Sequence, residues 1–257
     1  MKQPIESRVI VGLIALVVAF IVVVGIFVPA VPQDPNYHLF IDRETILNVS
    51  NFWNVVSNSL FLLVGIVGLI QLYVLNNLKI LPEIKSAYGI FFLGVTLVAF
   101  GSGYYHLLPN NQTLVWDRLP MTIAFMSLFS VVVGETVSIR LARFSLLPLI
   151  VSGGLSVLYW HFTELQGRGD LRFYALVQFL PLLLIPIMLV FLPSKFSHKS
   201  GYWYLFAFYI IAKLFEQFDS EVDAFLGFIS GHSLKHIAAA FGVLILLYTF
   251  RHRGTIS

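Results

Sequence analysis

Two histidines one helical turn apart open an apolar segment near the end of this sequence, and a third closes another apolar segment. His232 and His236 stand in "GHSLKH", and His106 ends "FGSGYYH". Residues four apart lie on one face of a helix, so His232 and His236 are within chelating reach of one cation. A third imidazole from another helix would complete the three-nitrogen face of catalytic zinc, with a fourth position open to water.

A histidine pair at this spacing is, by itself, more often a surface pair or a hydrogen-bonded core pair than a metal site. The chain has seven histidines and no cysteine, so any metal site must use His, Asp or Glu. We expect His38, His198 and His252, in loops or in the tail, to be solvated. His161 is expected to be either an interfacial anchor or a hydrogen-bonding partner of the site.

The composition places these histidines in a membrane protein. Hydrophobic residues make up 58% of the 257 and charged residues 11%, whereas soluble domains carry about 25% charge. A helix needs about 20 apolar residues to cross the hydrocarbon core. Eight runs approach this length: 9–29, 52–74, 87–107, 118–138, 144–161, 172–192, 202–218 and 233–250. We predict an all-α membrane protein, with a seven-helix transmembrane bundle core plus one extra N-terminal transmembrane helix, eight in total.

The distribution of positive charge predicts the orientation of this bundle. Residues 1–50 are expected to form the N-terminal helix and an outer loop, and residues 51–257 the seven-helix domain. The first run exceeds the roughly 7 to 15 apolar residues of a signal peptide, so a retained helix is favoured over a cleaved one. With the N-terminus inside, inner segments hold ten Lys and Arg residues and outer segments four. Both termini are therefore expected in the cytoplasm, and the positive charge indicates topology rather than nucleic-acid binding.

This topology brings five polar residues from three segments to the outer end of the bundle. Ser102 and His106 lie four apart at the end of the third helix, Asp117 begins the fourth, and His232 and His236 begin the eighth. The charges that set the topology do not include these residues, so their convergence is independent support for a site. Asp117 has a second interpretation as an N-cap, since a proline follows early in "DRLP". Ser102 also has a second interpretation, as a small packing residue.

Other polar residues in the apolar segments have structural interpretations. Asn54, Ser57 and Asn58 share a face at the outer start of the second helix, and interhelical hydrogen bonding is the favoured explanation. The group expected to form ion pairs that hold the last helix consists of Lys213, Glu216, Asp219 and Lys235. Glu135, toward the inner end of the fourth helix, is expected to reach the membrane interface.

The ordered motifs resemble one known family. "SGYYH" from Ser102 to His106, "DRLPM" from Asp117 and "HSLKH" from His232 to His236 together resemble the alkaline ceramidase family of intramembrane zinc amidases. The wider superfamily includes the adiponectin-type receptors and haemolysin-III-like proteins. "FWNVVSN" is similar to the family's opening helix, and "GRGDLRFYALVQFLP" and "GHSLKHIAAA" are similar to prokaryotic members. The resemblance covers about residues 50–250.

The resemblance implies a function and a set of site residues. His106, His232 and His236 would bind zinc, and Asp117 and Ser102 would be the catalytic partners of the metal-bound water. The reaction would be hydrolysis of a ceramide-like N-acyl lipid to a fatty acid and a free amine such as a sphingoid base. The implied partners are a membrane lipid and the bilayer, with no nucleic acid, and the implied location is the cell (inner) membrane of a prokaryote. The active site would face the non-cytoplasmic side.

The chain departs from the family at two places. The acidic segment that binds calcium in animal ceramidases ends in a Glu ahead of "FWN", where this chain has Asn51. The upstream Asp42, Glu44 and Asn48 have altered spacing, which argues against calcium control. A tryptophan-rich version of the last motif is replaced by Ser233, Leu234 and Lys235. This second departure bears on the identity of the lipid.

Two other classes of protein compete with the amidase. In a lipid-responsive receptor or a structural zinc protein built on the same bundle, the metal would tie the third and eighth helices together without turnover. An open coordination position beside Asp117 and Ser102 favours catalysis, although fold and ligands alone do not establish it. A transporter is less favoured, because the sequence has no evident pair of broken, repeated helices.

Overall fold

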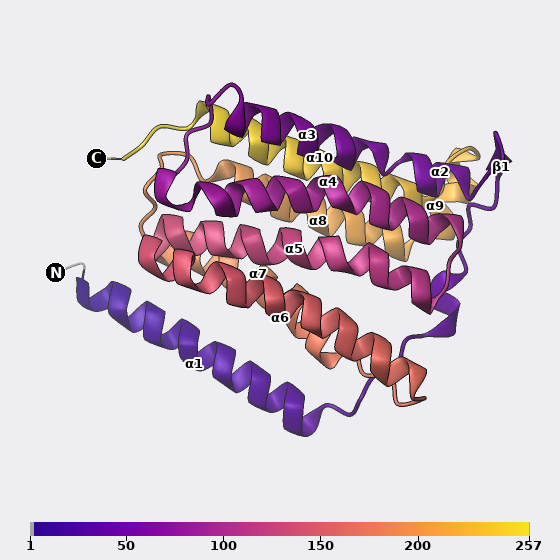
Figure 1. Cartoon of the computed structure of the whole chain (residues 1–257), viewed down its shortest axis with the longest axis horizontal. Helices are drawn as coiled ribbons and strands as arrows, with labels where there is room; N and C mark the ends of the chain where they lie inside the picture. Colours follow the sequence, from indigo (N-terminus) through magenta and orange to yellow (C-terminus); the bar gives the residue numbers. More distant parts are fainter. Residues whose placement is uncertain (1–2, 257) are drawn as a thin grey trace.

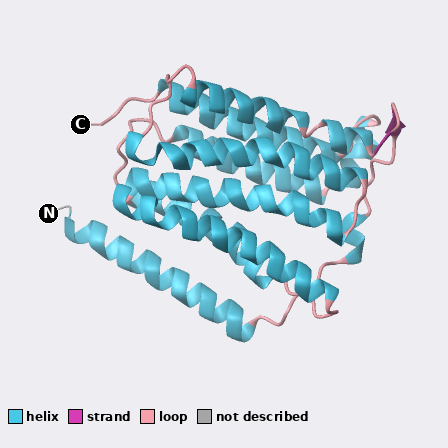
Figure 2. Cartoon of the chain, in the orientation of Figure 1, coloured by secondary structure: helices cyan, strands magenta, loops and turns pink. Residues whose placement is uncertain are grey.

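The computed structural model describes residues 3–256, which form a bundle of long helices (Figure 1). The α-helices are α1 (Gln3–Phe27), α2 (Phe52–Val56), α3 (Ser59–Tyr73), α4 (Lys85–Leu107), α5 (Asn111–Thr136), α6 (Ile139–Leu165), α7 (Arg172–Phe191), α8 (Ser200–Gln217), α9 (Asp219–Leu226) and α10 (Gly231–His252). The connections contain the 3₁₀ helices η1 (Pro35–His38) and η2 (Pro82–Ile84) and the antiparallel strands β1 (Thr45–Ile46) and β2 (Val49–Ser50). Figure 2 shows how little of the chain is not helical.

Seven helical segments within residues 3–256 are long and apolar enough to cross a membrane. They are Ser7–Phe27, Phe52–Tyr73, Pro82–Leu107, Asn111–Thr136, Ile139–Leu165, Arg172–Phe191 and Gly231–His252. The all-α architecture is therefore confirmed, and these segments indicate a membrane protein. Helix α8 packs beside α10, but its 18 residues include Lys213 and Glu216 and it is not one of the seven. The structure supports seven spans by length and composition, against the eight runs expected from the sequence.

Helices that follow one another in the chain build most of the bundle. Helix α3 packs on α4, α4 on α5, and α5 on α6, while α10 returns to pack on α8 and α3. Buried residues from α3, α4, α5, α7 and α10 form one apolar core, whereas many large apolar side chains on the outer faces are exposed, as contact with lipid requires. Both termini lie at the same end of the bundle (Figure 1). We call the opposite end, which carries β1, β2 and α9, the site end.

Helix α1 lies at the edge of the bundle and packs on α7 (Figure 1). Two hydrogen bonds attach the residues after it: Leu171 N donates to Val31 O at 2.9 Å, and Arg172 Nη1 donates to Val28 O at 2.8 Å. Arg172 also pairs with Asp170, with 2.8 Å between Nη2 and Oδ2. The Arg172 guanidinium lowers the pKa of Asp170 to about 2. Asp170 therefore fixes the arginine that attaches the end of α1.

This pair predicts an acid-sensitive part of the stability. The pKa of folded Asp170 lies below its ordinary value of 3.8, so the ionised carboxylate contributes stability that is complete above the ordinary pKa and is lost as pH falls toward the folded pKa. We expect Asp170→Asn to melt at a lower temperature than wild type at pH 7. We also expect the difference to shrink between pH 4 and 2, as measured by thermal unfolding in detergent. A difference that is constant with pH would contradict this assignment.

Helix α5 begins earlier than the sequence predicts, at Asn111 rather than at residue 118. The Asn110 side chain accepts hydrogen bonds from Gln112 N and Thr113 N, at 2.8 and 3.0 Å. In return Asn110 N donates to the Thr113 hydroxyl at 3.2 Å, which completes a capping box. Asp117 therefore lies inside the helix, and its interpretation as an N-cap is wrong.

Pro120 in the interior of α5 allows α4 to approach closely. A proline cannot donate to the carbonyl four residues earlier, which here belongs to Trp116. Helix α4 passes this carbonyl at Gly101, where a Cβ atom would lie 2.0 Å from Trp116 O. Because only glycine fits at this contact, the approach of the two helices depends on Gly101. The next residue of α4, Ser102, is thereby held opposite α5.

Two other segments differ from their predicted form. The run 52–74 is two helices, because α2 ends at Val56 and α3 begins at Ser59. Ser57 and Asn58, between them, are both buried. The segment 219–227, between the predicted runs 202–218 and 233–250, contains the short helix α9, which is followed by Gly227 in a left-handed conformation with φ of 73°. The left-handed conformation suits glycine, which has no Cβ to clash.

Glu135, near the end of α5, is 2% exposed, and its partners are side chains of the protein. Arg253 Nη1 and Nη2 donate to its two carboxylate oxygens at 3.0 and 2.6 Å. The Tyr88 hydroxyl donates to the same carboxylate at 2.5 Å. Arg253 directly follows α10, and its guanidinium lies 3.6 Å from the centre of the Phe196 ring. A buried ion pair therefore joins the end of α10 to α5.

Breaking this pair on one side should be costly. Removing one partner of a buried ion pair leaves an uncompensated charge and costs about 3–5 kcal/mol. We expect Glu135→Ala to lower the free energy of unfolding by this amount and the double variant Glu135→Ala, Arg253→Met to recover part of the loss, measured by thermal unfolding in detergent. Arg251→Met, which removes an exposed charge from the same turn, should have little effect. Strictly additive losses in the double variant would argue against the pair.

Candidate metal centre

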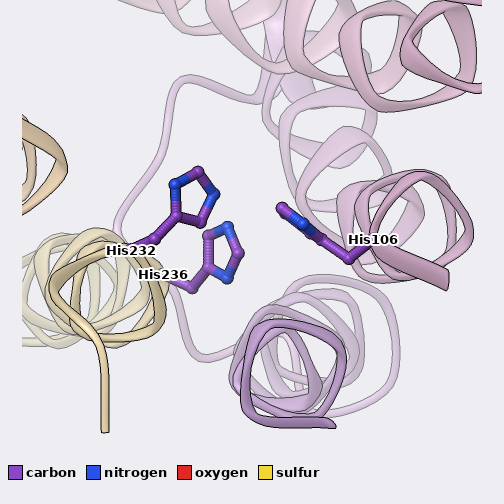
Figure 3. A group of neighbouring side chains, drawn as sticks. All are labelled: His106, His232 and His236. Carbon is purple, nitrogen blue, oxygen red and sulfur yellow. The ribbon is translucent and has the colours of Figure 1, made fainter. Parts of the chain in front are cut away.

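The three predicted ligands meet at the site end of the bundle (Figure 3). His106 comes from the last turn of α4, and His232 and His236 come from the first two turns of α10. Each offers a nitrogen atom within 4.8 Å of the nitrogens offered by the other two. Their exposed fractions are 1%, 5% and 5%, and Figure 3 shows the three rings facing one another. The predicted convergence of these residues is confirmed.

Local hydrogen bonds place each histidine. The Ser230 hydroxyl caps α10 by accepting from Ser233 N at 3.2 Å. Asp219 Oδ1 accepts from His232 N at 2.7 Å, which satisfies another of the free N–H groups of the first turn. At the end of α4, Asn51 Nδ2 donates to His106 O at 2.7 Å. The backbone on both sides of the cluster is thus held by side chains from outside α4 and α10.

His236 is oriented by the segment between α2 and α3. Its Nδ1 lies 2.8 Å from Ser57 Oγ and 3.3 Å from Asn58 Nδ2. The Ser57 hydroxyl donates to Asn54 O at 3.2 Å, so it is free to accept from His236 Nδ1 in the shorter contact. A proton on Nδ1 leaves the lone pair of Nε2 for a metal, and this is the usual way in which an outer hydrogen bond orients a histidine ligand.

Interhelical hydrogen bonds in this polar cluster are confirmed. The Ser233 hydroxyl donates to Asn54 Oδ1 at 2.8 Å, which connects α10 to α2. The sequence interpretation did not include the contact of Ser57 with His236, because it depends on the break after Val56. A serine in a helix break opposite a candidate ligand is the only signal that the sequence offers for it.

Lys235 has a contact that the sequence interpretation missed. As expected, its ammonium pairs with Glu216, at 3.1 Å, and Lys213 pairs with the same carboxylate. The Lys235 ammonium also lies 2.8 Å from His232 Nε2. Lys235 is the donor in this contact, because an ammonium has no acceptor atoms. A metal can bind His232 through Nδ1 with Lys235 in place, or through Nε2 once Lys235 has moved away from that nitrogen.

The donor set fits a metal such as zinc. Three neutral imidazoles with one open position match catalytic zinc sites. Among the described residues, the buried Nδ1 of His106 has no hydrogen-bond partner, and such an atom is costly unless it has another partner. The Phe40 ring packs on two of the imidazoles, with ring centres 4.7 Å from His106 and 4.5 Å from His232. It covers the cluster with an apolar surface.

Asp117 and Ser102, the two predicted catalytic residues, also come together at this end. Ser102 is 3% exposed, and its hydroxyl is an electrostatic neighbour of the Asp117 carboxylate. Both line one cavity together with His236. The cavity has a volume of about 400 Å³, which is within the usual range of ligand sites. The five predicted site residues therefore lie at the same end of the bundle.

The cavity extends away from the site end along the bundle. Its lining includes Pro181 and Pro186 of α7 and Tyr202 in the first turn of α8, which lies at the other end of the bundle. Apart from the groups at the site end, apolar side chains of α4, α5, α7, α8 and α10 form most of the surface. The shape suits a chain-like apolar ligand with its polar part near Asp117.

Two of the remaining histidines can be compared with expectation. His38 is partly buried and not simply solvated, because its ring nitrogens lie 2.9 Å from Tyr105 Oη and 2.9 Å from Asn111 Oδ1. His161 has a buried Nδ1 without a partner among the described residues. It makes no hydrogen bond to a candidate ligand there, which argues against its role as a hydrogen-bonding partner of the site.

The acidic residues before α2 are used by the fold. Asp42 is buried, and its carboxylate accepts from Asn54 N at 2.8 Å and from Glu44 N at 3.2 Å. Burial raises the pKa of Asp42, and these backbone N–H groups act in the opposite direction. Glu44 accepts from Trp53 Nε1 at 3.0 Å. Asp42 and Glu44 thus attach the loop to the first turn of α2.

Comparisons of the chain with protein-family models, with curated proteins and with solved structures found no match. The resemblance to the alkaline ceramidases therefore stays a prediction from the motifs. The evidence for a site is the geometry of the residues themselves.

Metal binding by the purified protein tests this centre. We expect about one zinc ion per chain, measured by elemental analysis, and loss of that zinc in His236→Ala. Ser57→Ala should keep the ligands but weaken binding about 10–100-fold, because outer hydrogen bonds contribute this much to metal affinity. His252→Ala, at an exposed position in the last turn of α10, is the control and should bind zinc as wild type does. Equal zinc content in wild type and His236→Ala would contradict the assignment.

Proposed function

We propose that this protein is a zinc-dependent amidase that hydrolyses a ceramide-like N-acyl lipid within the membrane. The observation that carries the proposal is the position of the Asp117 and Ser102 pair, which lines the same elongated apolar cavity as the candidate ligand His236. A structural metal site needs neither a carboxylate and hydroxyl beside it nor a cavity. The products would be a fatty acid and a free amine such as a sphingoid base.

The three histidines provide the setting for the chemistry. The three neutral imidazoles would hold zinc without reducing its charge, and the bound metal would supply a nucleophile at neutral pH by lowering the pKa of water from ~16 to about 7. Ser57 would keep His236 in the orientation that binding requires, through the contact at 2.8 Å. Phe40, packed on His106 and His232, would limit the access of bulk water to the cluster.

Asp117 is the proposed general base and acid. Its carboxylate would take a proton from the attacking water and later deliver it to the nitrogen of the leaving amine, which must be protonated to depart. Ser102, which lines the same cavity as Asp117, would donate a hydrogen bond to the carboxylate and hold it in position. When the substrate carbonyl is bound, the Ser102 hydroxyl would instead donate to the oxygen on which negative charge develops.

The cavity determines the proposed substrate class. An amide at Asp117 would place an acyl chain along the apolar walls toward Tyr202, a path that follows the helices across the bundle. Such a ligand reaches the cavity from the bilayer, and a soluble amidase does not meet it there. We therefore propose that the substrate is an N-acyl lipid and that the protein acts in lipid metabolism. Sphingolipids are the model for the substrate.

The proposed topology follows from the charge distribution. We propose that α8 also crosses the membrane, so that eight helices place both termini in the cytoplasm and the site end on the non-cytoplasmic side. The arrangement of the termini at one end of the bundle agrees with an even number of crossings (Figure 1). The inner membrane of a prokaryote is the proposed location, and no nucleic-acid partner is proposed.

Substitution of the proposed base separates hydrolysis from metal binding. We expect Asp117→Asn to bind zinc as wild type does but to lose hydrolysis of N-acyl sphingoid bases and N-acyl amino lipids about 10²–10⁴-fold, the usual contribution of a general acid or base. Product formation by mass spectrometry and zinc content by elemental analysis measure the two properties. Glu221→Gln, on the exposed surface of α9, is the control for the loss of a carboxylate.

Two outcomes would overturn parts of this proposal. Retained turnover by Asp117→Asn would remove the role assigned to Asp117. A wild-type protein that binds zinc but hydrolyses no member of an N-acyl lipid panel would instead support a receptor or a structural zinc protein, in which the metal joins α4 to α10.

A further inference from the structure

Arg118 is a buried cation for which the described side chains provide no ion pair. It is 5% exposed, and within residues 7–256 no carboxylate lies within ion-pair distance of it. Its one hydrogen bond in that part of the chain runs from Nη2 to Gln33 Oε1, at 2.6 Å. Its buried Nη1 has no hydrogen-bond partner there. Such a charge is strongly disfavoured in an apolar interior unless something compensates it.

The other buried arginine shows what is missing. Arg253 also packs on aromatic rings, but its guanidinium is paired with Glu135 at 2.6 Å. These two are the buried cationic residues of the described chain. One of them is neutralised by a carboxylate and the other is not, although they belong to the same bundle.

Aromatic rings hold the Arg118 guanidinium in place. Its central carbon lies 4.1 Å from the ring centre of Trp160, 4.7 Å from that of Tyr174 and 5.9 Å from that of Tyr37. Attraction to ring faces partly compensates the charge and fixes the plane of the guanidinium. It leaves N–H donors for another group, because ring faces do not satisfy them as oxygen atoms do.

Arg118 also belongs to the lining of the proposed substrate cavity. The charged side chains of that lining are Asp117, Arg118, Lys213, Glu216 and Lys235. Lys213 and Lys235 both pair with Glu216, so cations outnumber anions before any metal is added. Tyr37 and Tyr174, beside Arg118, line the same cavity. A ligand with its amide at Asp117 would place its polar group on this side.

We propose that Arg118 binds an anionic group of the lipid substrate, namely a phosphate, sulfonate or carboxylate on the amine part of the N-acyl lipid. A planar guanidinium binds such oxyanions through two parallel hydrogen bonds, which a lysine cannot reproduce. This inference rests on the proposed function, because only an amidase would use the bound lipid as a substrate. It narrows the proposed substrate from any N-acyl lipid to an anionic N-acyl lipid. The binding of an anionic amphiphile in this cavity does not depend on hydrolysis.

The first experiment measures binding without turnover. Asp117→Asn, purified in nanodiscs of phosphatidylcholine, is titrated with dodecyl phosphate, with the neutral 1-O-dodecylglycerol and with inorganic phosphate, and the affinity is read by calorimetry. We expect dodecyl phosphate to bind at least tenfold more tightly than either of the others. Equal affinity for the two amphiphiles would overturn the inference. Equal affinity for inorganic phosphate would show a site for a free anion and overturn the lipid part.

Variants of Arg118 in the same background then assign the preference. Arg118→Met should abolish the difference in affinity between the two amphiphiles. Arg118→Lys keeps the charge but should retain less than half of their difference in binding free energy. Arg168→Met removes an exposed arginine that is not part of the cavity lining and should keep the full preference. A preference that survives Arg118→Met, or that is lost in Arg168→Met alone, would overturn the assignment. If Arg118→Met does not fold, Arg118→Lys decides.

The second experiment measures turnover by the wild-type protein loaded with zinc. N-dodecanoyl taurine and N-dodecanoyl glycine, which are anionic, are compared with N-dodecanoyl ethanolamine, which is neutral. We expect kcat/KM to be at least tenfold higher for the anionic pair. Anion-selective binding with no hydrolysis of any of the three would contradict the amidase but leave the anion site in place. Hydrolysis of the neutral lipid at an equal kcat/KM would contradict the anion site but leave the amidase in place.

Discussion

Hydrocarbon offers no hydrogen bonds, and the positions of the polar side chains in this bundle depend on that constraint. A polar group that enters the apolar interior must find its partner within the protein, because neither water nor lipid supplies one. At one end Glu135 and Arg253 satisfy each other. At the other end, the histidines are connected to α2 through Ser57 and to α8 through Lys235 and Glu216. These contacts between helices hold the bundle together and also set the geometry of the candidate site.

The irregular features of the helices lie where this geometry requires them. The chain breaks between α2 and α3, and the hydroxyl of Ser57 in this break reaches His236. Pro120 interrupts the hydrogen bonding of α5, and Gly101 lets α4 approach at that point. Each feature costs regular hydrogen bonding or packing, and each places a polar side chain of the candidate site. Their positions agree with the expectation that local rules are broken at functional sites.

The sequence predicted most of the helices and the histidine cluster, for identifiable reasons. The spacing of His232 and His236 and the length of the apolar runs are local properties, so their consequences could be derived without coordinates. The start of α5 could also have been predicted from the sequence, since Asn110 and Thr113 have the spacing of a capping box. The contacts of Ser57, Lys235 and Arg118 could not be predicted from the sequence, because each depends on the rotation of one helix against another. The partner of Glu135 lies beyond the end of α10, where no periodic pattern indicates it.

The origin of the three imidazoles couples metal binding to the folding of the site end. His106 belongs to α4, whereas His232 and His236 belong to α10, and these helices are separated by more than 120 residues of sequence. An unfolded chain does not hold the three nitrogens together, so a metal that binds them binds only the folded arrangement. Its binding free energy is then added to the stability of the bundle by mass action. The concentration of free metal around the protein thus becomes one of the variables that determine how much of it is folded.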